Sequence, residues 1–268
     1  MMPLGRAACE SIARSTDRLS LAHPLRSFVS PPQGIVGGGV VEHLLANTDT
    51  TVVAVVRGGS RESPKNSGMD EAYPIRVFIP EDGSMDGLSD RIQRATGGRQ
   101  IDHVVSIFGG KAPRKPLSMF EDADVMASAE RSLPHLRLLR ALPTPRVSYT
   151  FVTGMLGERC FMPDKLTGMT LSNALLYGMI VAFRAELAAA GKSAVRVREL
   201  RIGSMLHRPD QDGAGGREGH PAIPASSDAA TAMQSFSSGL VGKFLVDAIE
   251  RDAPEDLIRL GDDAFRET

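Results

Sequence analysis

The stretch SPPQGIVGGGVVEHLLANTDTTVVAVVRGG, from Ser30 to Gly59, decides the fold because it joins a glycine-rich turn to a helix and a strand. Apolar residues repeat at helical spacing after the glycines, so we expect a helix that ends near Asn47. The β-branched run TTVVAVV that follows is typical of a strand buried on both faces of a parallel sheet. Glycines before a helix let a pyrophosphate approach unpaired backbone N–H groups. We predict a phosphate-binding turn over Gly34–Gly39, and a tight turn without a ligand is the alternative.

Strands and helices alternate along the rest of the chain. This alternation predicts an α/β fold, a three-layer doubly wound parallel sheet of the Rossmann-like type, in a single domain over 28–268. Residues 1–27 are interpreted as an N-terminal arm, and about 204–236 as a substrate-loop region. The expected strands are 28–30, 50–56, 75–79, 101–110, 146–154, 194–203 and 256–261. The expected helices are 87–95, 119–142 with an interruption at Pro134, 169–190 and 238–251.

Composition excludes several classes of function. The formal charge of −1 over 268 residues gives no field that recruits nucleic acid or an anionic membrane. Tryptophan is absent, which argues against a surface on which nucleic-acid bases stack. No apolar run reaches the ~20 residues that span a bilayer. The two cysteines, Cys9 and Cys160, form no disulfide framework, and the six histidines show no metal-ligand spacing. We expect a cytoplasmic protein with a small-molecule substrate and no metal.

Arg57 ends the strand that follows the glycine turn. In a doubly wound fold this position lies beside the adenosine ribose of a dinucleotide. An arginine there can neutralise the 2′-phosphate of NADP, so NADP(H) is favoured over NAD(H). A solvated arginine at the strand end is the alternative.

From Gly34 to Gly203 the order of segments resembles the short-chain dehydrogenase/reductase family. GIVGGGVVEHLL is similar to its glycine turn and first helix, and IDHVVSIFGG to the strand that in the family ends Asn-Asn-Ala-Gly. RVSYTFVTGMLGE resembles the strand that carries the catalytic serine. AFRAELAAAGKSAVRVRELRIGSMLHRP is similar to the long helix, sixth strand and Pro-Gly loop.

The resemblance implies a Tyr-x-x-x-Lys pair, a serine and an asparagine, and this sequence departs from that set. The Tyr position falls on Met169 and the Lys position on Asn173, neither of which moves a proton. Thr153 stands at the serine position, and residues 127–132, where the asparagine falls, contain none. Pro31 replaces the first glycine of the turn, Phe78 the adenine-capping acid, and Ile202 the proline before Gly203. The cofactor-binding residues that the resemblance implies are Gly34, Ile35, Gly37, Arg57, Gly109, Gly203 and Met205.

Several other side chains have groups that could take part in chemistry. His207 follows the sixth strand near the expected nicotinamide end and is the best-placed histidine for proton transfer. Glu158 and Asp164 follow the fifth strand, where an exposed rim charge is the ordinary role. Packing is expected for Tyr177 and His103, and a surface position for His135. Cys160 has no activating base nearby in sequence.

Three functions remain open. The first is an NAD(P)(H)-dependent oxidoreductase acting on an apolar carbonyl or alcohol, with Thr153 binding the oxygen and a non-standard acid or base. The second is an isomerase, cyclase or dehydratase whose pocket is lined by Met155, Met162, Met169 and Met205. The third is an inactive NADP(H)-binding regulator, and a chain that retains no cofactor is also open. The resemblance implies a homodimer or homotetramer through the helices after the fourth and fifth strands.

Overall fold

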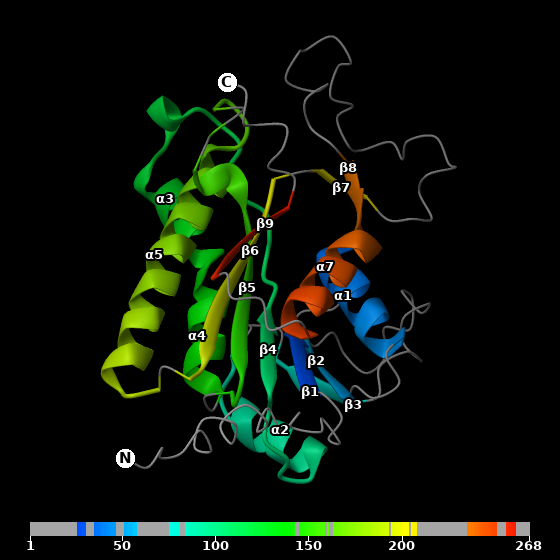
Figure 1. Cartoon of the computed structure of the whole chain (residues 1–268). Coiled ribbons are helices and arrows are strands. Elements are labelled where there is room, and N and C mark those ends of the chain that lie inside the picture. Colours follow the sequence, from blue (N-terminus) through cyan, green and yellow to red (C-terminus); the bar gives the residue numbers. More distant parts are fainter. Residues whose placement is uncertain are drawn as a thin grey trace, which may run out of the picture.

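A seven-stranded parallel sheet forms the centre of the molecule, which we describe from a computed structural model (Figure 1). The structure describes residues 26–30, 35–46, 51–57, 75–80, 84–142, 145–158, 160, 163–192, 194–203, 205–207, 235–250 and 256–260. The strand order is β3-β2-β1-β4-β5-β6-β9, with every neighbouring pair parallel. The strands are β1 (Arg26–Ser30), β2 (Thr51–Arg57), β3 (Ile75–Ile79), β4 (His103–Ser106), β5 (Ser148–Gly154), β6 (Arg196–Ile202) and β9 (Leu257–Leu260).

Helices cover both faces of this sheet, as the alternating sequence predicts (Figure 1). One face carries α1 (Ile35–Ala46) and α7 (Ser238–Glu250). The other carries α2 (Leu88–Thr96), α3 (Asp122–Glu130), α4 (Leu133–Ala141) and α5 (Thr167–Ala189). Two short 3₁₀ turns, η1 (Leu117–Met119) and η2 (Met155–Gly157), follow β4 and β5. The prediction of a three-layer Rossmann-like fold is confirmed.

Alternation along each strand divides the core between the two faces. Val53, Val104 and Phe151 pack under α2, α4 and α5, whereas their neighbours Val52, Val105 and Val152 pack under α1 and α7. Because adjacent side chains point to opposite faces, a strand covered on both sides must be apolar throughout. This requirement explains the unbroken β-branched runs in the sequence.

The predicted glycine turn over Gly34–Gly39 is wrong in its extent. Helix α1 begins at Ile35, so Gly37, Gly38 and Gly39 are buried helical residues. Packing of α1 against α7 accounts for Gly39, because a methyl group added at Gly242 would overlap the carbonyl oxygen of Gly39. Glycine costs about 1 kcal/mol in a helix interior relative to alanine, and close helix contact offsets that cost here.

The fourth strand is shorter than expected, only His103–Ser106, since Gly109 and Gly110 lie in an exposed loop. The interruption expected in the helix over 119–142 is confirmed: two helices meet at Arg131 and Ser132, and Pro134 lies in the first turn of the second, where its missing N–H costs nothing. A parallel pair, β7 (Met205–His207) with β8 (Ser235–Ser237), was not predicted.

Substitution of Gly242 by alanine tests the contact between α1 and α7. The added methyl group meets backbone atoms of Gly39, which have no rotamer to move into, so we expect a loss of about 1–3 kcal/mol of unfolding free energy. Urea denaturation measures this loss. Lys243→Ala is the neighbouring control and should cost at most about 0.5 kcal/mol, because it removes only an exposed pair with Asp247. A Gly242→Ala protein as stable as that control would contradict the packing.

Candidate functional site

The candidate site lies at the edge where β1 and β4 end. The chain winds from β1 towards β3 and then returns to β4 on the other side. In doubly wound sheets the ligand-binding crevice lies at this reversal of strand order, outside the carboxyl ends of the two strands. Helix α1 starts five residues after β1 and presents its amino end there. Only its first four N–H groups lack helical partners, and Gly37 and Gly38 bring no side chains to that turn. Gly39, which the predicted turn over Gly34–Gly39 included, therefore lies beyond the free N–H groups. Ile35 begins the helix, and Gly34 and Pro31 lie outside the described residues.

The loop after β4 forms one wall of this edge. Gly109 and Gly110 are exposed, and the side chain of Arg131 lies over them, with Nη2 3.8 Å from an ideal Cβ position on Gly109. The same loop reaches the start of α5, where Pro113 packs against Gly168 so closely that a Cβ there would lie 2.8 Å from the Pro113 carbonyl oxygen. Gly168 thus allows the loop and the helix to touch.

The break between α3 and α4 is joined to α5 by a buried hydrogen bond. The Ser132 hydroxyl donates to the carbonyl oxygen of Ser172 over 2.7 Å and lies 2.8 Å from the Ser172 hydroxyl. Ser132 belongs to the window 127–132 in which the asparagine of the resembled family was expected. A hydroxyl therefore links the two helices beside Asn173.

Asn173 connects α5 to the end of β5. Its Oδ1 accepts a hydrogen bond from the Gly154 N–H over 3.0 Å, and its Nδ2 donates to the Met169 carbonyl oxygen over 2.9 Å. Both ends of the amide are thus used by the backbone. Met169 is half-buried in the first turn of α5. In this arrangement Asn173 positions a strand end and holds no charge with which to shift the pKa of a neighbour.

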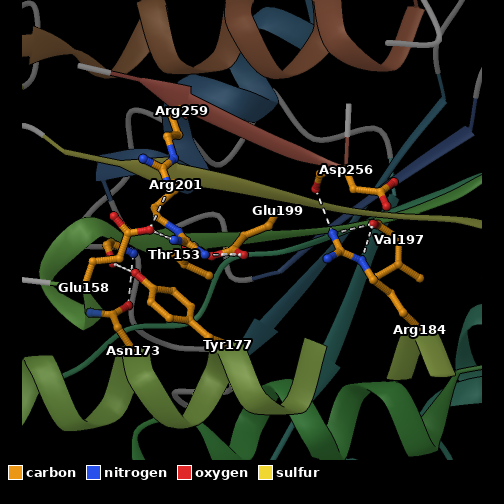
Figure 2. A network of polar contacts seen from close by, with 11 residues as sticks. Thr153, Glu158, Asn173, Tyr177, Arg184, Val197, Glu199, Arg201, Asp256 and Arg259 are labelled. Atoms are coloured by element: carbon orange, nitrogen blue, oxygen red, sulfur yellow. Dashed lines mark hydrogen bonds and ion pairs between the residues drawn. The ribbon is translucent and has the colours of Figure 1, made fainter. Parts of the chain in front are cut away.

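The sequence predicts that the Thr153 hydroxyl binds the substrate oxygen, but in the structure this hydroxyl is already engaged. It is buried and donates to Oε1 of Glu199 on β6 over 2.6 Å (Figure 2). Burial raises the pKa of the Glu199 carboxyl, and the hydrogen bond from Thr153 and the charges of Arg184 and Arg259 oppose that shift. The hydroxyl still has lone pairs with which it could accept a second hydrogen bond.

Arg201 is the centre of the polar network in Figure 2. Its guanidinium makes two bonds to Glu199, of 2.9 and 2.7 Å, and one to Glu158. Arg259 lies opposite Arg201 in the β6–β9 register and bonds the same Glu158 over 2.9 Å. Two like charges directly opposite would repel, so Glu158 stabilises the pair by lying between them. Burial, and then the charge of Arg259, lowers the pKa of Arg201 to about 10, which leaves it charged at neutral pH.

Tyr177 packs against Arg201 and hydrogen-bonds the end of β5. The Arg201 guanidinium carbon lies 3.8 Å from the ring centroid, and the phenol donates to the Gly154 carbonyl oxygen over 2.5 Å. Burial, followed by the charge of Glu199, raises the pKa of Tyr177, so the phenol stays protonated. Asn173 and Tyr177 therefore bind the two sides of one residue, Gly154, one helical turn apart.

The sequence analysis missed Glu199, Arg201 and Arg259 as a set. They share one face of neighbouring strands, and the spacing of two residues along β6 was the signal that places Glu199 and Arg201 on that face.

The remaining predicted residues lie at several places. Gly203 is buried, and a Cβ there would overlap the sulfur of Met155, so a larger residue would displace that side chain. Arg57 ends β2, and Met205 and His207 lie in β7. The side chains of these three residues lie outside the described part of the chain, and so do Met162 and all of 208–234. Cys160, Asp164 and Glu158 are exposed, Phe78 is half-exposed, and Ile202 ends β6.

Within the described ranges, His, Cys, Asp and Glu side chains form no group of three that could hold a metal ion. One described helix, α5, is long and apolar enough to cross a membrane by length and composition. It packs on the sheet through Leu176, Ile180 and Leu187, as a core helix does.

The predicted surface position of His135 is wrong, whereas His103 is buried in β4 as expected and lies 2.8 Å from the Ser148 hydroxyl. His135 is buried at the start of α4, with Nδ1 2.7 Å from the Ser106 hydroxyl and its ring edge-to-face with Phe108. The leucines around His135 in LPHLRLL gave no sign of a polar partner, because that partner is a serine 29 residues earlier in the chain. Burial lowers the pKa of His135 to about 3.

Because the unfolded chain protonates His135 near pH 6.5 and the folded protein only near 3, unfolding takes up a proton between these values. The free energy of unfolding should therefore fall as the pH falls from 6.5, by up to about 1.4 kcal/mol per pH unit from this residue. Urea denaturation between pH 7 and 4.5 should show a shallower slope for His135→Gln than for the wild type. Equal slopes would contradict a neutral buried imidazole.

Solved structures match the fold over most of the chain, although no family model and no curated protein matches the sequence. L-sorbose reductase from Gluconobacter frateurii, solved with NADPH and L-sorbose, has a TM-score of 0.66 at 14% identity, covering 92% of this chain and 98% of its own. A short-chain dehydrogenase/reductase from Serratia marcescens has a TM-score of 0.64 at 12% identity, covering 89% and 98%. A short-chain dehydrogenase from Streptomyces avermitilis has 0.65 at 18% identity, covering 92% and 90%. The chain therefore has the fold of the short-chain dehydrogenase/reductases.

Proposed function

We propose that this protein is an NAD(P)(H)-dependent oxidoreductase that acts on a small or medium apolar alcohol or carbonyl compound. The observation that carries the proposal is the amino end of α1 at the edge where β1 and β4 end. Unpaired N–H groups at that end, next to Gly37 and Gly38, fit the pyrophosphate of a dinucleotide. Arg57 at the end of β2 supports NADP(H) over NAD(H), since its charge suits a 2′-phosphate.

Among the described residues, Thr153 and Glu199 are the groups that we assign to proton transfer. The bound nicotinamide would accept or supply the hydride. A substrate alcohol would donate its hydrogen bond to Thr153 Oγ1, whose own proton already points to Glu199 over 2.6 Å. As the alcohol becomes a carbonyl compound, its proton passes to Thr153 and the Thr153 proton passes to Glu199. In the reverse direction a protonated Glu199 returns the proton by the same route.

Glu199 suits this role because burial raises its pKa and so makes its carboxylate a stronger base. Oxidation needs the ionised carboxylate, so its rate should fall as the pH drops through the pKa of Glu199. Reduction needs the protonated acid and should show the opposite dependence. Arg201 holds the carboxylate in place through two hydrogen bonds.

A second candidate is an NADP(H)-binding regulator without turnover. Thr153 is only 5% exposed, and both ends of the Asn173 amide are bonded to backbone, which favours a site that no longer reacts. An isomerase, cyclase or dehydratase draws less support, because Met155 is packed against Gly203 rather than open to a ligand.

The matched variants Thr153→Val and Thr153→Ser test the proton route. Valine keeps the shape and removes the hydroxyl, so kcat/KM for NADP-linked oxidation over a panel of alcohols should fall by about 10²–10⁴-fold. Serine keeps the hydroxyl and should retain most of the activity. NADPH affinity, followed by fluorescence, should stay within about threefold in both variants. Wild-type binding without turnover would favour the regulator, and equal rates for the two variants would remove Thr153 from the chemistry.

We also propose that the protein forms a homodimer. Apolar side chains are exposed on the helices that follow β4 and β5, the faces that sequence analysis assigned to a partner. They are Val125 and Met126 on α3, Leu136 on α4, and Leu175 and Val181 on α5. Ala174, Gly178 and Ala182 are also exposed on α5, and small residues at this spacing allow a second helix to approach closely. A second copy of the chain presents the same self-complementary surface.

Val181→Glu should convert this dimer to a monomer, because it places a charge on the shared apolar face. Light scattering coupled to size exclusion measures the mass. Phe244→Glu on α7 is the control, since Phe244 is also exposed but lies on the opposite layer, and it should leave the mass unchanged. A monomeric wild type at working concentration, or loss of the dimer in both variants, would contradict this interface.

A further inference from the structure

The Arg131 guanidinium is half-buried, and no described residue pairs with it. It follows the last residue of α3, and its side chain packs over Gly109 and Gly110. Its Nε is buried and has no hydrogen-bond partner, and no ion pair joins Arg131 to an acid in the described part of the chain. Burying an unpaired cation costs free energy, so native proteins nearly always give it a partner.

The place of Arg131 connects it to the crevice. Gly109 follows β4, which is one side of the switch point, so the guanidinium lies at the same edge as the amino end of α1. The next residue, Ser132, is bonded to Ser172 and so holds Arg131 against the start of α5. The loop that Arg131 covers also touches Gly168, one residue before Met169. Arg131 therefore covers a loop that runs from the end of β4 to the start of α5.

The surroundings add positive charge and no described counter-charge. Lys111 and Arg114 are exposed on the same loop as Gly109, whereas Lys115 is taken up by Asp124 over 2.7 Å. The nearest ionisable partner on α4 is His135, whose pKa is lowered by burial and, to a smaller degree, by the charge of Arg131. That imidazole is neutral and cannot balance the guanidinium. Burial also lowers the pKa of Arg131 itself.

We infer that Arg131 binds an anionic group, a phosphate or a carboxylate, of the ligand that occupies this crevice. A guanidinium suits both groups because its planar donors match two oxygen atoms at once. The inference deepens the proposed function, on which it rests only in placing a ligand at this edge. The anion belongs either to the dinucleotide or to a substrate that carries a carboxylate on its apolar body.

Calorimetric titration of the full chain tests this site with three probes: sodium pyrophosphate, NADPH, and acetate added to the NADPH-saturated protein. Arg131→Met removes the charge and keeps much of the side-chain volume. It should weaken binding of at least one probe about tenfold or more, since a charge-assisted bond is lost. Arg131→Lys should restore part of the affinity, and Arg140→Met, an exposed arginine of α4, should change none of the three.

The pattern of losses identifies the source of the anion. Weaker binding of pyrophosphate and NADPH assigns Arg131 to the nucleotide, and weaker binding of acetate alone assigns it to a substrate carboxylate. The ligand-free Arg131→Met protein should melt at the same temperature as the wild type or higher, because an unpaired buried charge is removed. A lower melting temperature would reveal a protein partner for Arg131 and overturn the inference.

Two further results separate this inference from the proposed function. If all three probes bind Arg131→Met and Arg140→Met equally, or if the wild type binds neither pyrophosphate nor acetate, the anion site is wrong. If pyrophosphate binds through Arg131 while NADPH does not bind the wild type, the anion site stands and the oxidoreductase proposal fails.

Discussion

The hydrogen bonds between Asn173 and the end of β5 determine how the candidate site is built. One amide accepts from the Gly154 N–H and donates to the Met169 carbonyl oxygen, while Tyr177 bonds the other side of Gly154. These contacts fix α5 against the sheet and fix the position of Thr153, the residue before Gly154. They also occupy both ends of the Asn173 amide, which is therefore not free to bind a ligand. A shift of α5 would therefore disturb the strand end and its buried hydroxyl together.

The charges around this strand end satisfy one another. Glu199 and Glu158 alternate with Arg201 and Arg259, so each cation meets a carboxylate. Glu199 and Arg201 are buried, whereas Glu158 and Arg259 are exposed. Breaking a buried pair by removing one partner is costly, because the other charge is left without solvent or counter-ion. The Glu199–Arg201 pair therefore holds the buried Thr153 hydroxyl in place through its hydrogen bond to Glu199. Arg131 differs because no described carboxylate balances it.

Much of the fold could be predicted from local patterns. The β-branched runs in β2 and β5 and the apolar stripe of α5 gave the sheet and its covering helices, because burial on two faces demands those patterns. Helix packing was less predictable. Gly37, Gly38 and Gly39 resemble a ligand turn in sequence, and only the approach of Gly242, about 200 residues later, reveals that Gly39 serves a helix contact. The bonds of His135 with Ser106 and of Thr153 with Glu199 are equally distant in sequence. Which residues form such pairs depends on how the strands and helices are arranged in space. The spacing of residues along the sequence does not reveal that arrangement.

The most direct measurement of the central claim is amide hydrogen exchange with and without NADPH. The account predicts slower exchange at the start of α1, over Val36–Gly38, and in the loop after β4 that contains Gly109 and Gly110. Exchange in α2, at the far end of β3, should not change. If saturating NADPH leaves the α1 amides and the β4 loop as exposed as in the free protein, the edge between β1 and β4 is not a nucleotide site and the account is wrong.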